Sequence, residues 1–343
     1  MKKRFFGKAL LLAFLCLLPS ATVQAAARNT SSAYQKLNEG RPVRIAVLGD
    51  SIADRTGVEP NDSWNTLLFD WLHNEYPSQI TMESYAVGGT SSYTGYYQSE
   101  TAMRKKIRKN GQYDLVIICY GQNDDTANFG LYYEGMLRSV KKQNPSCQFI
   151  LILESTQQTY TDKMQEILRL AEVYHADVAD TINAFALSGI PFEQLTPDGT
   201  HPNAAGHWLY FETIRDVIKN GVAQGKTVTG MPPATTPYVT LFENYSFVPL
   251  ETCRNENGQY RFVPKSPAVG IVFQKFPGGS DILLEFSTGE LWADSGDTVI
   301  EKNWTIAAPV GLLVAPGTTI TLEDATGTVG ETVSGFICSG YLP

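Results

Sequence analysis

The chain has 343 residues, of which 43% are hydrophobic and 18% charged, and its formal net charge at pH 7 is −8. This composition is typical of a folded globular protein and excludes an intrinsically disordered one. The acidic balance disfavours nucleic acid and anionic lipid surfaces as partners, and the length is sufficient for two domains.

Residues 1–27 have the pattern of a secretory signal peptide. They begin with four basic residues, Lys2, Lys3, Arg4 and Lys8. The apolar run over 9–18 is too short to span a bilayer as a helix, and small residues follow it. We expect cleavage between Ala25 and Arg28, which would leave an extracytoplasmic protein of charge −12 without membrane attachment. An uncleaved signal anchor is the alternative.

Residues 28–220 alternate short apolar runs with longer amphipathic stretches. The apolar runs are continuous, as expected of parallel strands covered on both faces, and occupy 43–48, 80–86, 115–119, 149–153 and 176–179. Stretches with helical periodicity occupy 63–74, 128–142, 161–175 and 204–219. This repetition predicts a three-layer α/β/α sandwich around a parallel sheet of the flavodoxin-like order 2-1-3-4-5.

The pattern changes after residue 220. Residues 221–237 form a linker rich in Gly, Thr and Pro, and 238–343 contain short β-type runs separated by turn residues. We expect a C-terminal all-β sandwich that serves as an accessory domain. Because the linker includes Pro232-Pro233, we expect few contacts across it and a catalytic machinery that is complete without the β domain.

Four cysteines follow residue 27, and none has the close spacing of a zinc site. Cys119 and Cys147 fall at opposite ends of the predicted sheet, too far apart for a disulfide. Cys253 and Cys338 both lie in the predicted β domain, and the sequence leaves open whether they form a disulfide.

Polar motifs follow the predicted strands at the points where the strands end. Gly-Asp-Ser at 49–51 follows the first strand, Gly88-Gly89 the second, and Gly-Gln-Asn-Asp at 121–124 the third. A fourth motif, 196–207, precedes the last helix. Since the carboxyl ends of parallel strands meet at one edge of the sheet, where ligands bind, we expect these motifs to converge.

The converging residue types suit ester hydrolysis. Ser51 is a weak nucleophile that needs an adjacent base, which His201 can provide. Asp198 can bond the other ring nitrogen of His201 and fix its tautomer. The oxyanion needs preorganised donors, and the N–H groups of Ser51 and Gly89 and the side-chain amide of Asn123 can supply three.

Each motif also has a purely structural interpretation. Asn123 and Asp124 can cap the helix that begins near 128. Gly88-Gly89 can form a tight loop, and His201 can belong to a helix entry.

Taken together, the four motifs resemble the SGNH hydrolase superfamily, also called GDSL esterases and lipases. The resemblance covers about residues 41–220 and implies metal-free and cofactor-free hydrolysis of esters. By position it implies a catalytic triad of Ser51, Asp198 and His201, with an oxyanion hole formed by Ser51, Gly89 and Asn123. Many members have Asn shortly before the second-block glycine, where this chain has Ser84-Tyr85-Ala86. This departure leaves the choice between Gly88 and Gly89 open.

The substrate is less well determined by the sequence. Tyr93, Tyr96 and Tyr97 follow Gly89 and can stack on sugar rings at the crevice, or can pack against neighbouring loops. An exported hydrolase with an added β-sandwich favours removal of O-acetyl groups from a polysaccharide or peptidoglycan. One alternative is a lipase or general short-chain acyl esterase. Another is a carbohydrate-binding or adhesion protein with an inactive hydrolase-like scaffold.

Overall fold

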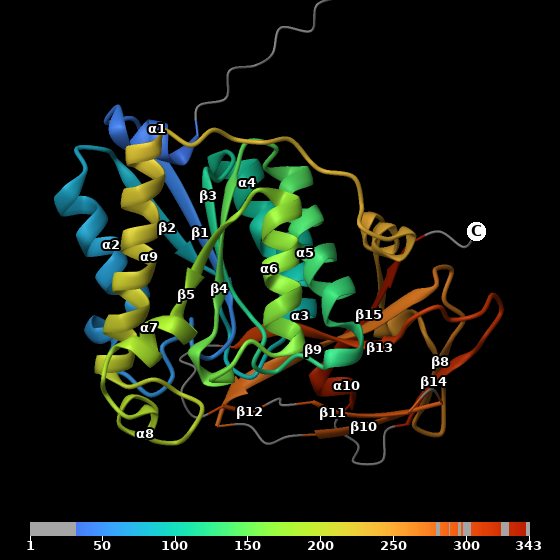
Figure 1. Cartoon of the computed structure of the whole chain (residues 1–343). Helices are drawn as coiled ribbons and strands as arrows, with labels where there is room; N and C mark the ends of the chain where they lie inside the picture. Colours follow the sequence, from blue (N-terminus) through green and yellow to red (C-terminus); the bar gives the residue numbers. More distant parts are fainter. Residues whose placement is uncertain are drawn as a thin grey trace, which may run out of the picture. The chain divides into compact units, whose positions relative to one another are not determined.

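The computed structural model describes residues 32–278, 282–287, 289–293, 296–297, 303–323 and 329–340 (Figure 1). The expected signal peptide, 1–27, lies outside these residues. Within the described ranges, no helix combines the length and hydropathy that crossing a membrane requires.

The N-terminal domain is built on a parallel five-stranded sheet of order β2-β1-β3-β4-β5, which confirms the predicted α/β sandwich and strand order. The strands are β1 (Val43–Gly49), β2 (Ile80–Ser84), β3 (Leu115–Cys119), β4 (Gln148–Leu153) and β5 (Asp177–Asp180). Their register places Gly49 at the end of β1 opposite Cys119 at the end of β3. The motifs that follow these two strands therefore start at the same edge.

Helices cover both faces of this sheet, with α2 and α9 on one side and α5 and α6 on the other (Figure 1). Their bounds are α1 (Ala33–Asn38), α2 (Trp64–Glu75), α5 (Phe129–Gln143), α6 (Asp162–Tyr174), α7 (Thr181–Leu187), α8 (Phe192–Leu195) and α9 (Ala204–Gln224). Helix α9 runs into the expected linker and ends at Gly225, whose φ of +60° suits a glycine cap.

The longest helical region that the sequence analysis missed consists of α3 (Ser92–Gln98), a π-helical turn (Ser99–Met103) and α4 (Arg104–Asn110). The short helices α1, α7 and α8 were missed as well. Every residue of α3 is buried, so this helix has no polar face. Without amphipathic periodicity, its sequence gives no helix signal.

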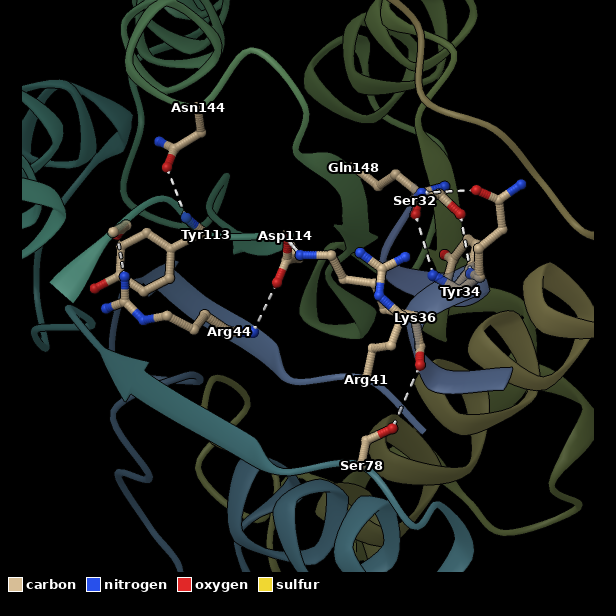
Figure 2. Close-up of polar contacts among 12 residues, drawn as sticks. Ser32, Tyr34, Lys36, Arg41, Arg44, Ser78, Tyr113, Asp114, Asn144 and Gln148 are labelled. Atoms are coloured by element: carbon tan, nitrogen blue, oxygen red, sulfur yellow. Dashed lines mark hydrogen bonds and ion pairs between the residues drawn. The ribbon is translucent and has the colours of Figure 1, made fainter. Parts of the chain in front are cut away.

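Polar side chains close the amino-terminal edge of the sheet (Figure 2). Asp114 bonds Lys36 through one carboxylate oxygen, and its other oxygen accepts the N–H of Arg44 at 3.0 Å. The N–H of Tyr113 donates to Asn144 Oδ1 at 2.8 Å. These bonds satisfy backbone N–H groups near the starts of the strands. The polar motifs of the candidate site lie at the opposite, carboxyl-terminal edge.

The C-terminal domain contains two five-stranded sheets. One has the order β11-β10-β14-β8-β7, and the other has β12-β9-β15-β6 with β13 paired to β9. The strands are β6 (Tyr245–Pro249), β7 (Arg254–Glu256), β8 (Gln259–Phe262), β9 (Ala268–Pro277), β10 (Ile282–Phe286), β11 (Gly289–Ala293), β12 (Gly296–Asp297), β13 (Trp304–Gly311), β14 (Ile320–Glu323) and β15 (Val333–Ser339). Among the residues that the structure describes, the pairings in this domain are antiparallel except that of β12 with β9. The predicted all-β domain is thus confirmed.

Residues of both domains form one of the hydrophobic core clusters, so the expectation of few contacts between the domains is wrong. Thr94 Oγ1 in α3 donates to the carbonyl of Ala307 in β13 at 2.6 Å. Gly270 in β9 packs so closely on α3 that a Cβ there would lie 2.6 Å from the Tyr93 ring. Phe242, which follows the linker, packs edge-on against Tyr93 with ring centroids 6.4 Å apart. The described residues from 32 onward accordingly belong to one compact unit.

The four cysteines after residue 27 are buried and free in the structure. Cys253 and Cys338 both belong to the core of the β domain, as thiols.

Candidate active site

Ser51 lies in the turn that follows β1, and only 6% of its surface is exposed. Gly49 allows this turn to approach β3 closely, because a Cβ there would lie 2.5 Å from Ala53 Cβ and 2.8 Å from the Cys119 carbonyl. The turn is closed by the N–H of Ile52, which donates to Asp50 Oδ1 at 3.0 Å.

His201 reaches Ser51 from the loop between α8 and α9. Its Nε2 lies 3.0 Å from Ser51 Oγ, and its Nδ1 lies 2.7 Å from Asp198 Oδ2. A carboxylate that accepts from Nδ1–H leaves Nε2 as the acceptor for the serine proton. The three residues of the predicted triad are therefore brought together in the order that nucleophilic catalysis requires.

Asp198 is held as a carboxylate although it is exposed. Its Oδ1 accepts the N–H groups of His201 at 2.6 Å and Thr200 at 2.8 Å. Slight burial raises the pKa of Asp198, but these two N–H groups and the His201 ring outweigh it and lower the pKa to about 2. Asp198 therefore remains negatively charged throughout the neutral range.

The loop after β2 distinguishes Gly89 from Gly88. The N–H of Gly88 donates to Asp54 Oδ2 at 3.2 Å, and Gly88 is buried. Gly89 is exposed with φ +71°, and no acceptor in the described part of the chain bonds its N–H. This geometry favours Gly89 as an oxyanion donor.

Asn123 in the loop after β3 is exposed, and its amide points back toward the other two loops. Its Nδ2 donates to the carbonyl of Thr90 at 3.0 Å and lies 3.5 Å from Asp50 Oδ2. The helix-cap interpretation of Asn123 is wrong, because Asp125 caps the short helical turn 126–128.

Asp124 caps a different helix from the one expected. Its carboxylate accepts the N–H and the hydroxyl of Ser92 at the start of α3. Burial raises the pKa of Asp124 to about 6, against the lowering effect of the two Ser92 bonds and nearby Lys163. The loop that carries Asn123 is thereby attached to α3.

A cavity of about 250 Å³ adjoins Gly89 and Asn123 and extends to the β domain. One wall comes from the α/β domain and includes Thr94 and Tyr132. The other wall comes from β9 and β13, with Phe273 in the first strand and residues 306–309 in the second. Neither strand was assigned a part in the site from the sequence.

The three tyrosines predicted to bind sugar do not line this cavity. Tyr93, Tyr96 and Tyr97 are 1%, 0% and 9% exposed and lie in the core shared by the two domains. The Tyr96 hydroxyl forms a hydrogen bond with Ser339 Oγ in β15, at 2.9 Å. Burial leaves no ring face for stacking on a substrate, so the substrate-binding assignment is not supported, and the alternative of packing holds.

Among the described residues, one group of potential metal donors is close together: Asp50, Cys119 and Glu154. All three are fully buried, and Cys119 Sγ donates to Glu154 Oε1 at 3.4 Å. Hydrogen bonding accounts for their proximity, and we interpret the group as an acid cluster. The sequence analysis did not single out Glu154. This residue directly follows the apolar run 149–153, and Asp50 follows the run 43–48 after one glycine.

The parallel sheet and the hydrogen-bonded chain of serine, histidine and aspartate define an α/β serine hydrolase. Residues 47–209 match the GDSL-like Lipase/Acylhydrolase family. The α/β domain is thus a member of this family of ester-hydrolysing enzymes.

Two solved structures resemble most of the chain. The crystal structure of a two-domain esterase (CEX) active on acetylated mannans has a TM-score of 0.66 at 18% identity, covering 90% of this chain and 94% of that one. The same kind of esterase co-crystallized with mannopentaose has a TM-score of 0.68 at 16% identity, covering 91% and 97%. At this identity the similarity establishes a shared two-domain fold. No curated protein matches the chain.

Proposed function

We propose that the protein removes O-acetyl groups from a polysaccharide, with Ser51 as the nucleophile. The observation that carries the proposal is the chain of hydrogen bonds from Ser51 Oγ through His201 to Asp198. The cavity bordered by Gly89 and Asn123 is the space that we assign to the acyl group.

The proposed reaction proceeds in two halves. His201 Nε2 accepts the Ser51 proton as Oγ attacks the ester carbonyl, and the N–H groups of Ser51 and Gly89 and the Asn123 amide stabilise the oxyanion. His201 then donates its proton to the departing sugar oxygen, which leaves an acetyl ester on Ser51. In the second half His201 takes a proton from water, whose oxygen attacks this ester. His201 then donates that proton to Ser51 Oγ as the bond to the acetyl group breaks, which releases acetate and restores the enzyme.

The polysaccharide substrate is supported by two features. The cavity is small compared with the pockets of drug-sized ligands, which suits a short acyl group rather than a long fatty chain. Its second wall belongs to a β domain, and a two-domain esterase of this overall fold acts on acetylated mannans. Sugar contacts would then come from β9 and β13 instead of from Tyr93, Tyr96 and Tyr97.

Acetate release distinguishes this proposal from the alternatives. We expect acetylated mannan or another acetylated polysaccharide to release acetate, and p-nitrophenyl acetate to be cleaved faster than esters of increasing chain length. Faster cleavage of long-chain esters would favour a lipase. If the wild type binds polysaccharide but releases no acetate, a carbohydrate-binding protein is favoured.

We further propose that the protein is exported. The support is the basic, apolar and small-residue order of residues 1–27. Expression of the full chain in a secreting host should yield a mature amino terminus between Ala25 and Arg28. A cell-retained protein that keeps residue 1 would contradict export with cleavage.

A further inference from the structure

The carboxyl groups of Asp50 and Glu154 lie close together in the core beneath Ser51. Both residues are fully buried, and one oxygen from each lies within 4.8 Å of the other. Asp50 immediately precedes the nucleophile, and Glu154 immediately follows β4. Neither carboxyl group takes part in the hydrolytic steps described above.

Each carboxyl group holds a different segment of the active site. Asp50 accepts the N–H of Ile52 in the nucleophile turn. Glu154 accepts the N–H of Gln122 in the loop after β3. Because Asn123 Nδ2 also lies 3.5 Å from Asp50 Oδ2, the two carboxyl groups connect the nucleophile turn with the loop that carries the oxyanion amide.

One oxygen of this pair lacks a hydrogen-bond partner. Glu154 Oε2 is buried, and no donor in the described part of the chain bonds it, although a buried acceptor of this kind is costly to leave unpaired. Gly121 keeps the surrounding space tight, since a Cβ there would lie 3.2 Å from this oxygen and 2.7 Å from Met164 Cε. A proton between the two carboxyl groups supplies the missing donor and removes one of two buried negative charges.

We propose that Asp50 and Glu154 share a proton, and that this acid pair positions the Asn123 amide relative to Ser51. The role as a positioning pair rests on the proposed function of Ser51 and Asn123, whereas the shared proton does not.

The pKa directions agree with a retained proton. Burial raises the pKa of Glu154 to about 7, and burial followed by the charge of Glu154 raises that of Asp50 well above its ordinary range. The pair therefore holds a proton in the folded state that the unfolded chain releases above about pH 4. The other titratable groups that act on the pair or its loop are Asp124, Cys119, Tyr120, Tyr133, Tyr210 and Lys163.

The test compares Glu154→Gln with Glu154→Leu in the full chain. The glutamine amide can donate to Asp50 while its carbonyl accepts the N–H of Gln122, so this variant mimics the protonated acid. Leucine can do neither. We expect Glu154→Leu to lower kcat on p-nitrophenyl acetate at least about tenfold with KM changed less than about twofold, and Glu154→Gln to recover most of that loss. Equal kcat for wild type and Glu154→Leu would overturn the positioning role.

The shared proton has its own readout. Because the folded pair retains a proton, the free energy of unfolding should fall as the pH rises from about 5 to 7, and in Glu154→Gln this slope should be shallower by about one proton. Asp50→Asn, whose amide can also donate to Glu154, should show the same change. Slopes identical to that of the wild type in both variants would overturn the shared proton.

Two comparisons separate the possible failures. If the wild type cleaves no ester, the proposed function fails, and the pH slopes still decide whether the proton is shared. Glu134→Gln is a matched control, since Glu134 is a fully buried carboxylate on α5 that bonds Tyr174 and Thr235 and has no contact with the triad. Its kcat should remain within about twofold of the wild type.

Discussion

At the residue scale, the active site depends on polar side chains whose positions are fixed by hydrogen bonds that take no part in the reaction. Asp198 accepts two backbone N–H groups in addition to the His201 ring, which keeps its carboxylate in place although it is largely in water. Asn123 is oriented by the carbonyl of Thr90. Such preorganised groups need little rearrangement when charge develops on the substrate.

Replacement of Asn123 tests its role as an oxyanion donor. We expect Asn123→Ala to lower kcat by about 10²- to 10³-fold with little change in KM, because the amide acts mainly on the transition state. Since Asn123 is exposed and caps no helix, the melting temperature should change little. Kinetics and melting curves from the same preparation provide the measurement. A variant that is less stable but fully active would show that Asn123 is structural.

At the element scale, a buried histidine joins two helices on one face of the sheet. His207, in the first turn of α9, is fully buried, and its Nδ1 accepts the N–H of Trp64 at the start of α2, at 3.2 Å. Burial, and next the nearby His201, lower the pKa of His207 to about 4. The folded state therefore excludes a proton that the unfolded state binds below about pH 6.5.

This difference predicts a pH-dependent loss of stability. The effect of His207 on the free energy of unfolding begins as the pH falls below about 6.5. The loss grows toward pH 4 and reaches about 3 kcal/mol below that value. His207→Gln keeps an acceptor for the N–H of Trp64 and cannot be protonated in this range. Chemical unfolding between pH 7 and 4 should show a smaller loss for the variant. Parallel curves for both proteins would exclude His207 as the cause.

Elements with a clear pattern were predictable from the sequence, and those without one were not. Continuous apolar runs located the five parallel strands. The polar motif after the first strand and the motif before the last helix located the three residues that the structure brings together at Ser51. Helix α3 was missed because it is buried on every side. Tyr93 was consequently assigned to the surface, whereas its neighbours include Gly270, a contact between residues far apart in the chain. No local pattern encodes such a contact.

At the scale of the whole molecule, the β domain packs on the helices beside the site and adds a wall to the cavity. The shared core cluster and the bond from Thr94 to the Ala307 carbonyl show that the described residues from 32 onward act as one unit. Changes in β9 should therefore affect both stability and the binding of substrate.

Gly270 provides a test of this coupling. A methyl group there would meet the Tyr93 ring, so we expect Gly270→Ala to lower the free energy of unfolding by about 1–3 kcal/mol and to raise KM for acetylated polysaccharide. Gly230→Ala is the control, since no atom lies within 4 Å of the added methyl group. Equal melting temperatures for both variants would mean that the two domains are not tightly packed.

The central claim is that Ser51 is the nucleophile of an esterase. The most direct measurement is peptide mass spectrometry of the full chain after reaction with a fluorophosphonate. We predict one adduct on Ser51 that forms in parallel with the loss of acetate release, and no adduct on Ser51→Ala. An adduct on another serine that accounts for the lost activity, or full activity in Ser51→Ala, would contradict the account.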